Sequence, residues 1–237
     1  MESRRKAIIL LSGGLDSTVA AWMLRPRVEP VLALTADYGQ KAARRELAAA
    51  YALAQRLGIP HRTVFLPFLR EAASGPLMDP GTPVPEPAQE DLDDVEGAAR
   101  KSAAAVWIPN RNGVLIAVAA AWAEAAEVDL VACGFNREEA ATFPDNSREF
   151  LEAQNRALSF STRTGVRVVS PTIEMTKEEI AGKGRALGVP FELCWPCYLG
   201  GQQPCGKCES CRRYERALVG AGVPLQPEGG WGRVSPS

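Results

Sequence analysis

Residues 8–20, with the sequence IILLSGGLDSTVA, constrain the fold of this chain more than any other stretch. The first four are apolar, and Ile8 and Ile9 are β-branched, which predicts a short buried strand. The Ser-Gly-Gly that follows predicts a tight turn, because glycine tolerates positive φ. A helix that begins at Asp16 directly after such a turn presents free backbone N–H groups, which favour an anion and above all phosphate. The alternative is an ordinary strand-to-helix turn with a Ser/Asp cap.

Two common phosphate motifs, G-x-x-x-x-G-K-[ST] and G-x-G-x-x-G, do not occur in this stretch. The order S-G-G-x-D-S after an N-terminal strand instead resembles the PP-loop of the ATP pyrophosphatases. In that superfamily the loop holds the pyrophosphate of ATP, and the chemistry is adenylation. The resemblance assigns ATP to Leu11, Ser12, Gly13, Gly14, Leu15, Asp16, Ser17 and Thr18, with Asp37 and Gln40 after the second predicted strand.

Strand and helix patterns alternate along the chain, which predicts an α/β fold with a doubly wound, parallel, five-stranded sheet. Ligands of such sheets lie at the carboxyl ends of the strands, so the turns after the first two strands should converge. The predicted strands are residues 8–11, 28–36, 61–66, 128–133 and 166–169, and the predicted helices are 16–25, 40–57, 114–126, 147–163 and 176–188.

The pattern disappears between residues 67 and 105, where prolines cluster and an acidic stretch, residues 90–94, follows them. A loop of this length is usually functional or mobile. Two interpretations stay open: a lid over the predicted site, or a solvated excursion without a role.

Five of the six cysteines lie between residues 194 and 211, which in a reducing compartment indicates a metal site rather than disulfides. The spacing suits a tetrahedral zinc site, and an iron–sulfur cluster is the rival interpretation. Cys194 is expected to be a spare thiol beside the metal, and Cys133 a small buried hydrophobe. Residues 191–237 would then form a small zinc-binding appendage with a helical segment, after an ATP-binding domain of residues 1–190. The predicted metal ligands are Cys197, Cys205, Cys208 and Cys211.

The composition excludes several classes of partner. The formal net charge is −1 and the pI is near 6.0, whereas proteins that bind nucleic acid usually carry a basic excess. The longest apolar run, residues 114–123, is too short to span a bilayer. We therefore expect a cytoplasmic protein with no nucleic acid and no membrane as partner.

Taken together, the motifs resemble the 7-cyano-7-deazaguanine synthase family, the QueC-type members of the PP-loop superfamily. The sequence departs from the family pattern in two places, the first of which lies where a substrate base would bind. Residues 139–146 read EAATFPDN where the family usually has D-Y-S-G-Y-P-D-C, and residues 194–196 read CWP where it has Thr-Trp-Ser. The resembling segments are residues 10–18, 34–40, 109–112, 143–145 with 149–150, 170–171 with 176–177, and 197–212.

This resemblance implies the fold of the adenine nucleotide alpha hydrolases and an ATP-dependent carbon–nitrogen ligase of queuosine-type deazapurine biosynthesis. ATP would adenylate the carboxylate of 7-carboxy-7-deazaguanine, ammonia would give the amide, and a second ATP would lead to the nitrile. The implied cofactors are ATP, Mg²⁺ and Zn²⁺, and a homodimer is implied. The alternatives are a PP-loop enzyme with another acceptor, including a tRNA-modifying one, and a non-enzymatic zinc-ribbon module.

The residues themselves suggest roles in this chemistry. Ser12 and Ser17 can donate to phosphate, and Asp16 can hold Mg²⁺ or orient a reactant, while Arg111 and Lys177 are candidate cations for phosphate or carboxylate. Aromatic rings can stack on a purine-like base, and a carboxylate can accept hydrogen bonds from its amino-pyrimidine edge. The catalytic candidates are Asp16, Ser17 and Lys177, and the substrate candidates are Arg111, Asn112, Phe135, Asn136, Phe143 and Asp145.

Overall fold

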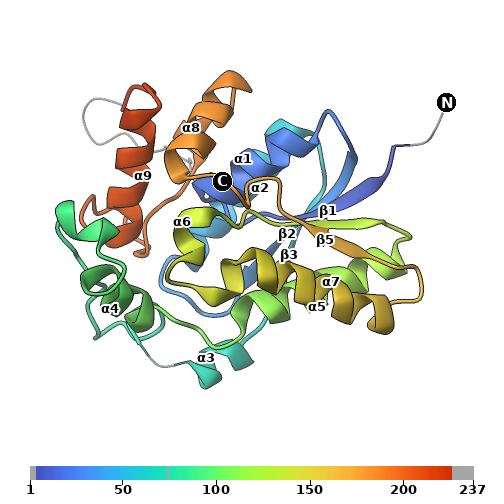
Figure 1. Ribbon diagram of the computed structural model, residues 1–237, viewed down its shortest axis with the longest axis horizontal. Helices are drawn as coiled ribbons and strands as arrows, with labels where there is room; N and C mark the ends of the chain where they lie inside the picture. Colours follow the sequence, from blue (N-terminus) through green and yellow to red (C-terminus); the bar gives the residue numbers. More distant parts are fainter. Residues whose placement is uncertain (1–3, 74, 226–237) are drawn as a thin grey trace.

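The computed structural model describes residues 4–73 and 75–225, and its centre is one parallel sheet with the strand order β3-β2-β1-β4-β5 (Figure 1). The predicted five-stranded, doubly wound sheet is confirmed. All four strand pairs are parallel, and the order reverses at β1, which pairs with both β2 and β4. The strands are β1 (Lys6–Leu10), β2 (Glu29–Asp37), β3 (His61–Phe65), β4 (Leu130–Ala132) and β5 (Arg167–Val169).

Helices cover both faces of the sheet. One core cluster joins β1 to α1, α2, α8 and α9, and a second joins the sheet to α5 and α7. The helices are α1 (Leu15–Leu24), α2 (Ala43–Leu57), α3 (Phe68–Ala72), α4 (Ala98–Ala105), α5 (Arg111–Ala125), α6 (Arg137–Ala140), α7 (Arg148–Ser161), α8 (Lys177–Ala186) and α9 (Glu209–Gly220), with short 3₁₀ turns η1 (Glu90–Asp93), η2 (Pro144–Asn146) and η3 (Phe191–Leu193).

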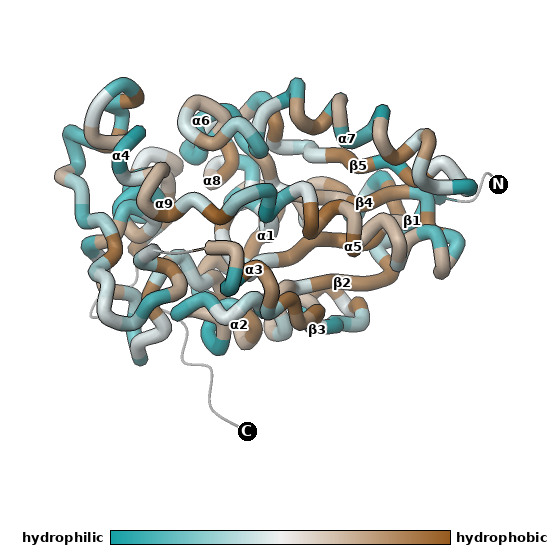
Figure 2. Tube along the Cα trace, turned by 90° about the horizontal axis from the view of Figure 1, so that it is seen from below, coloured by the Kyte–Doolittle hydropathy of each residue, from teal (hydrophilic) through white to brown (hydrophobic). Residues whose placement is uncertain are grey.

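The continuous apolar run of β1 follows from its central position. Ile9 and Leu11 belong to the core on the α1 side, whereas Ile8 belongs to the core on the α5 side. Because successive side chains of a strand point to opposite faces, a strand covered on both faces needs apolar residues throughout. Figure 2 shows the result, a sheet whose strands are mainly hydrophobic between more polar helices.

Two predicted helix boundaries are confirmed by their caps. Gly58 ends α2 with φ 73°, in the left-handed region that favours glycine. Thr176 begins α8 with a capping box: its hydroxyl accepts from the Glu179 N–H, and the Glu179 carboxylate accepts from the Thr176 N–H. The capping box fixes the start of α8, and with it the position of Lys177.

The segment from residue 67 to 105 is more ordered than the sequence pattern predicts, because it contains α3, η1 and α4. It packs on α9: Arg213 donates to the Leu92 carbonyl at 2.7 Å, and Arg216 pairs with Asp93 at 2.8 Å. The Ser102 hydroxyl also donates to Glu209. These partners lie more than a hundred residues apart, so local periodicity could not reveal them. A role of this segment as a lid stays a prediction.

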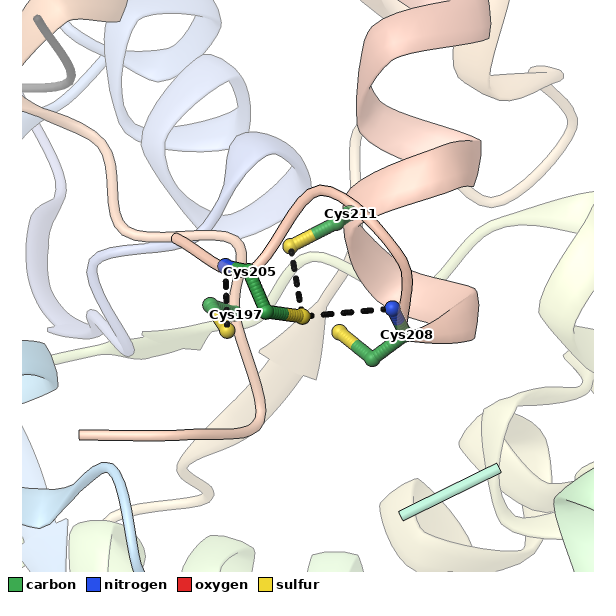
Figure 3. A group of neighbouring side chains, drawn as sticks. All are labelled: Cys197, Cys205, Cys208 and Cys211. Atoms are coloured by element: carbon green, nitrogen blue, oxygen red, sulfur yellow. Dashed lines mark hydrogen bonds between the residues drawn. The ribbon is translucent and has the colours of Figure 1, made fainter. Parts of the chain in front are cut away.

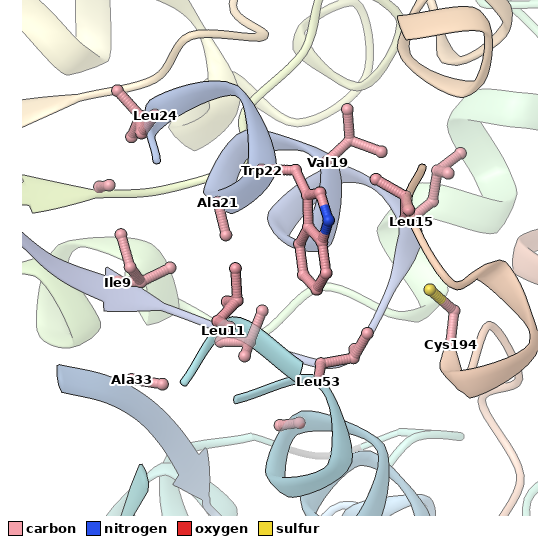
Figure 4. Close-up of a cluster of buried hydrophobic side chains, with 14 of the residues drawn as sticks. Ile9, Leu11, Leu15, Val19, Ala21, Trp22, Leu24, Ala33, Leu53 and Cys194 are labelled. Carbon is pink, nitrogen blue, oxygen red and sulfur yellow. The ribbon is translucent and has the colours of Figure 1, made fainter. Parts of the chain in front are cut away.

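The two cysteines outside the predicted metal set are both buried. Cys133 is a small hydrophobe as expected, and burial raises the pKa of its thiol to about 12. The expectation that Cys194 packs beside the metal ligands is wrong: it lies in the main core near Leu15 and Val19 (Figure 4), with its Sγ 3.8 Å from the Thr18 hydroxyl. The start of α1 fills the space around this thiol.

α9 packs closely on α8 and contributes Tyr214, Ala217 and Leu218 to the main core. The division into units of residues 1–190 and 191–237 stays a prediction, and residues 1–3 and 226–237 of those units lie outside the described residues. None of the helices in the described part of the chain combines the length and the apolarity that a membrane crossing needs.

Candidate active site

A pocket of about 280 Å³ lies at the carboxyl end of the sheet, where the strand order reverses. The loop after β1, the residues after β2 and β4, the starts of α5 and α8, and the cysteine segment all contribute to it. Most sequence-predicted residues are brought together here. Those that line it are Leu11, Ser12, Gly14, Leu15, Asp16, Ser17, Gln40, Arg111, Asn112, Phe135, Phe143, Lys177 and Cys197.

The turn between β1 and α1 leaves the helix N-terminus open. Gly14 is the N-cap residue and supplies no side-chain cap, so the first N–H groups of α1 have no partner within the helix. The hydroxyls of Ser12 and Ser17 are 2.9 Å apart, and the Ser12 hydroxyl accepts from the Gly14 N–H at 3.4 Å. The structure therefore favours the anion site over a Ser/Asp-capped turn.

Two glycines make this arrangement possible. Gly13 has φ 82°, and a Cβ there would lie 2.9 Å from both the Ala49 Cβ and the Glu46 carbonyl. The backbone of Gly134, which follows β4, packs directly against the start of α1, and a Cβ at this position would lie 2.4 Å from the Ser17 nitrogen. Sequence analysis identified Gly13 but missed Gly134, whose only signal is its place directly after a predicted strand.

Lys177 lies between two carboxylates. Its Nζ is 2.6 Å from Asp16 Oδ2 and 2.7 Å from Glu139 Oε1, and the residue is 8% exposed. The other Asp16 oxygen, Oδ1, is buried and has no hydrogen-bond partner among the described residues. Glu139 was not among the predicted site residues, although it lies in the segment that departs from the family pattern. Lys177 is thus a neutralising partner, and Asp16 keeps one acceptor for a ligand.

The cluster of Asp16, Lys177 and Glu139 predicts that the adenylation expected from the sequence depends on pH. Burial raises the pKa of Asp16 to about 6, Lys177 opposes the shift, and Glu139 adds to it. Since an ionised Asp16 is the form that can hold a cation, the rate of adenylation should fall as the pH drops through this pKa. The variant Glu139→Gln removes a negative charge, so the pKa of Asp16 falls and the acid limb moves to lower pH.

The measurement is the pH profile of pyrophosphate release at limiting ATP. The control is Glu152→Gln, because Glu152 is exposed on α7 and does not line the pocket. An acid limb that stays in place in Glu139→Gln would contradict this assignment of the charges.

The other half of the pocket contains Tyr38, Gln40, Glu46 and Arg111. Arg111 makes no ion pair within 4.0 Å with any residue of the described ranges, unlike Lys177. Burial alone would lower the pKa of Arg111, but Tyr38 and Asp145 outweigh it and raise the pKa. Arg111 is therefore always charged and open to an anion.

Among the predicted nucleotide and substrate residues, five do not line the pocket: Gly13, Thr18, Asp37, Asn136 and Asp145. Asn136 caps α6 by accepting from the Glu139 N–H at 2.9 Å. Asp145 accepts through its carbonyl from Asn112 at 3.2 Å and through Oδ1 from an amide neighbour at 3.3 Å. Asn136 and Asp145 thus support residues that line the pocket, and the assignment of all five residues to ligands stays a prediction.

The two predicted aromatic residues line the pocket but already have ring partners. Phe143 stacks on Trp107 with 6.3 Å between ring centroids, and Phe135 tilts against Phe150 at 6.2 Å. Sequence analysis did not assign four further aromatic residues of the lining to the site: Tyr38, Trp195, Tyr198 and Tyr214. Tyr38 lies within the family-like D-Y-G-Q segment, which could have identified it.

The predicted metal ligands come together at the start of α9 (Figure 3). The sulfur atoms of Cys197, Cys205, Cys208 and Cys211 all lie within 4.8 Å of one another, and those of Cys205 and Cys211 are 4.0 Å apart. Four ligands at the zinc–sulfur bond length of about 2.3 Å in a tetrahedron place sulfur atoms about 3.8 Å apart. Backbone N–H groups donate to Cys197 and Cys205 at 3.3–3.5 Å, as around metal-bound thiolates.

The cysteine segment is tied to the turn after β1. The Trp195 N–H donates to the Gly13 carbonyl at 2.9 Å, and the indole N–H donates to Leu199. Arg45 of α2 lies over the Trp195 ring, 5.2 Å from its centroid. The cysteine cluster thus holds one wall of the pocket and one carbonyl of the anion-binding turn.

Comparison with known proteins places the chain in a family. The family model described as "Queuosine biosynthesis protein QueC" matches residues 6–222. A protein named "7-cyano-7-deazaguanine synthase" from Pelotomaculum thermopropionicum is 52% identical over 93% of this chain and 100% of its own. One with the same name from Desulforudis audaxviator is 52% identical over 92% of this chain and 98% of its own. One with the same name from Bdellovibrio bacteriovorus is 45% identical over 95% of this chain and 98% of its own. The chain therefore belongs to the family of the queuosine biosynthesis protein QueC.

Proposed function

We propose that this protein is a 7-cyano-7-deazaguanine synthase, which converts 7-carboxy-7-deazaguanine and ammonia into the nitrile with ATP. The observation that carries the proposal is that one pocket holds both the open N-terminus of α1 and a separate cation, Arg111. An enzyme that adenylates an acid needs both, one for the pyrophosphate of ATP and one for the carboxylate. The names of the relatives supply the identity of the acid.

The proposed reaction has four steps. A carboxylate oxygen of the acid attacks the α-phosphorus of ATP, and pyrophosphate leaves. Ammonia attacks the acyl carbon, AMP leaves, and a proton is lost, which gives the amide. The amide oxygen attacks a second ATP, and pyrophosphate leaves again. AMP and both protons of the amide nitrogen are then lost, so that the carbon–nitrogen triple bond forms.

The first and third steps place growing negative charge on pyrophosphate. The backbone N–H groups at the start of α1 and the hydroxyls of Ser12 and Ser17 can donate to it. Lys177 offsets one of the two negative charges of Asp16 and Glu139, so it weakens the repulsion between this cluster and ATP. Arg111 would hold the carboxylate that is to be activated.

Mg²⁺ fits this site. The partnerless, buried Oδ1 of Asp16 is a hard oxygen ligand of the kind that Mg²⁺ prefers. Asp16 would hold the ion, which when bound supplies positive charge for the phosphates.

Zinc fits the cysteine cluster, because four thiolates on tetrahedral spacing with N–H donors around them form a closed structural site. Cys197, Cys205, Cys208 and Cys211 would hold it, and its role would be structural. A cytoplasmic location and a homodimer complete the proposal.

The test is incubation of the protein with 7-carboxy-7-deazaguanine, ammonia and MgATP, followed by mass spectrometry. We expect the nitrile, AMP and pyrophosphate, with two ATP consumed per nitrile. Absence of pyrophosphate release above that with ATP alone would overturn the proposal. Release without nitrile or amide would indicate a different acceptor acid.

A further inference from the structure

We infer that Glu46 recognises the donor edge of the base in the substrate acid; this inference rests on the proposed function. A guanine-type ring presents two adjacent N–H donors, at its ring nitrogen and its exocyclic amino group. A carboxylate with a free oxygen is the natural acceptor for such a pair. The first question is which carboxylates of the pocket are available.

Three carboxylates line the pocket in the described part of the chain: Asp16, Glu46 and Glu139. Asp16 and Glu139 are both paired with Lys177, within 2.7 Å of its Nζ. Glu46 has no cation within 4.0 Å among the residues that the structure places. Asp145, the acceptor that the sequence suggested, does not line the pocket. Glu46 is thus the pocket carboxylate not committed to a cation.

The position of Glu46 is fixed by its neighbour in the family-like D-Y-G-Q segment. Gln40 donates to Glu46 Oε2 at 2.7 Å and to the Ala36 carbonyl at 3.2 Å, and its own oxygen accepts from the Tyr38 N–H at 3.0 Å. The hydrogen bonds of the Gln40 side chain are therefore all made within the protein, and one of them fixes Oε2 of Glu46. The other oxygen, Oε1, has no hydrogen-bond partner in residues 4–73 and 75–225, yet it is not sealed off from the pocket.

The surroundings of Glu46 suit a flat ring. Tyr38, Leu77, Val106 and Tyr198 form one apolar cluster and all line the pocket. Burial raises the pKa of Glu46, and the Gln40 hydrogen bond and the more distant charge of Arg111 oppose the shift. Two N–H donors of a bound base would replace the water that an empty pocket offers this carboxylate. On the substrate, the carboxyl group lies across the ring system from this donor edge, so Glu46 would leave it free for adenylation.

The experiment compares two ligands on the full chain. We would measure binding of 7-carboxy-7-deazaguanine and of the same acid without its exocyclic amino group, for the parent and for Glu46→Gln. The parent should prefer the complete base at least about tenfold. Glu46→Gln should bind the complete base at least about tenfold more weakly, lose most of that preference, and keep its affinity for ATP. The matched control is Glu71→Gln, since Glu71 is exposed on α3 and outside the pocket.

Each contrary result has a distinct meaning. A Glu46→Gln variant that loses ATP affinity instead would assign Glu46 to the nucleotide and overturn the inference. Equal binding of both ligands by the parent would overturn the inference about Glu46. This result needs no variant, so it does not depend on whether Glu46→Gln folds. A parent that binds neither deazaguanine ligand, but releases pyrophosphate with another acid, would overturn the proposed function and the inference with it.

Discussion

Replacing Asp16 by alanine is expected to lower adenylation on the order of 10³-fold while the chain stays folded. The change removes the buried, partnerless Oδ1 and the ionic partner of Lys177 at 2.6 Å. Asp16 lies in the first turn of α1, and the pyrophosphate charge would develop at the open N-terminus of this helix. The readout is pyrophosphate release from ATP in the presence of the deazaguanine acid.

The stability of this variant should change little. In this variant Lys177 still pairs with Glu139, whose Oε1 is 2.7 Å from its Nζ. A large loss of stability usually comes from a buried charge that has lost its partner, and here none does. The control is Asp91→Ala, because Asp91 lies in η1 and does not line the pocket. Turnover near that of the parent in Asp16→Ala would remove Asp16 from the mechanism. Loss of the folded state on thermal unfolding would show a structural role instead.

The sheet and the anion-binding turn could be predicted because their causes are local. A central strand covered on both faces must be apolar at every position, and Ile8 and Ile9 are. A turn that needs φ 82° between a strand and a helix selects glycine, and Gly13 meets that need. The cysteine cluster was predictable for the same reason, because three of its four ligands lie within seven residues of the chain.

The electrostatics of the site could not be predicted, because they depend on distant partners. Lys177 was predicted as a candidate cation for phosphate or carboxylate, and the structure pairs it with carboxylates from α1 and α6. Glu46 reads in the sequence as one more polar residue of an amphipathic helix. It becomes part of the site only because α2 packs against the turn after β1. Asp145 shows the reverse case, a residue of a family-like segment that does not line the pocket.

The second large effect is expected from Cys208→Ser. Cys208 is fully buried at the start of α9, and its sulfur is one of the four in the cluster. We expect one zinc per parent chain and well under one per variant chain. Structural zinc sites contribute about 10–16 kcal/mol to the folding of small zinc-finger peptides. Loss of one ligand should therefore lower the free energy of unfolding by several kcal/mol, a large part of the roughly 5–15 kcal/mol of a typical domain.

The matched control is Cys194→Ser, because Cys194 is equally buried but lies in the main core, outside the cluster. It should keep one zinc per chain, as measured by metal analysis of the purified protein. Iron with sulfide in the parent would overturn zinc, and full metal content in Cys208→Ser would overturn the ligand assignment.

Cys208→Ser should also weaken ATP binding at temperatures where the chain is still folded. The cluster holds the segment from which Trp195 donates to the Gly13 carbonyl at 2.9 Å, so a loosened cluster frees the turn that binds phosphate. Titration of ATP well below the unfolding midpoint separates this effect from global unfolding. ATP affinity equal to that of the parent, in a folded variant without metal, would show that the cysteine site stabilises the chain without shaping the turn. Weaker ATP binding that returns when zinc is restored to a metal-depleted parent would show that the metal acts on the nucleotide site through Trp195 and Gly13.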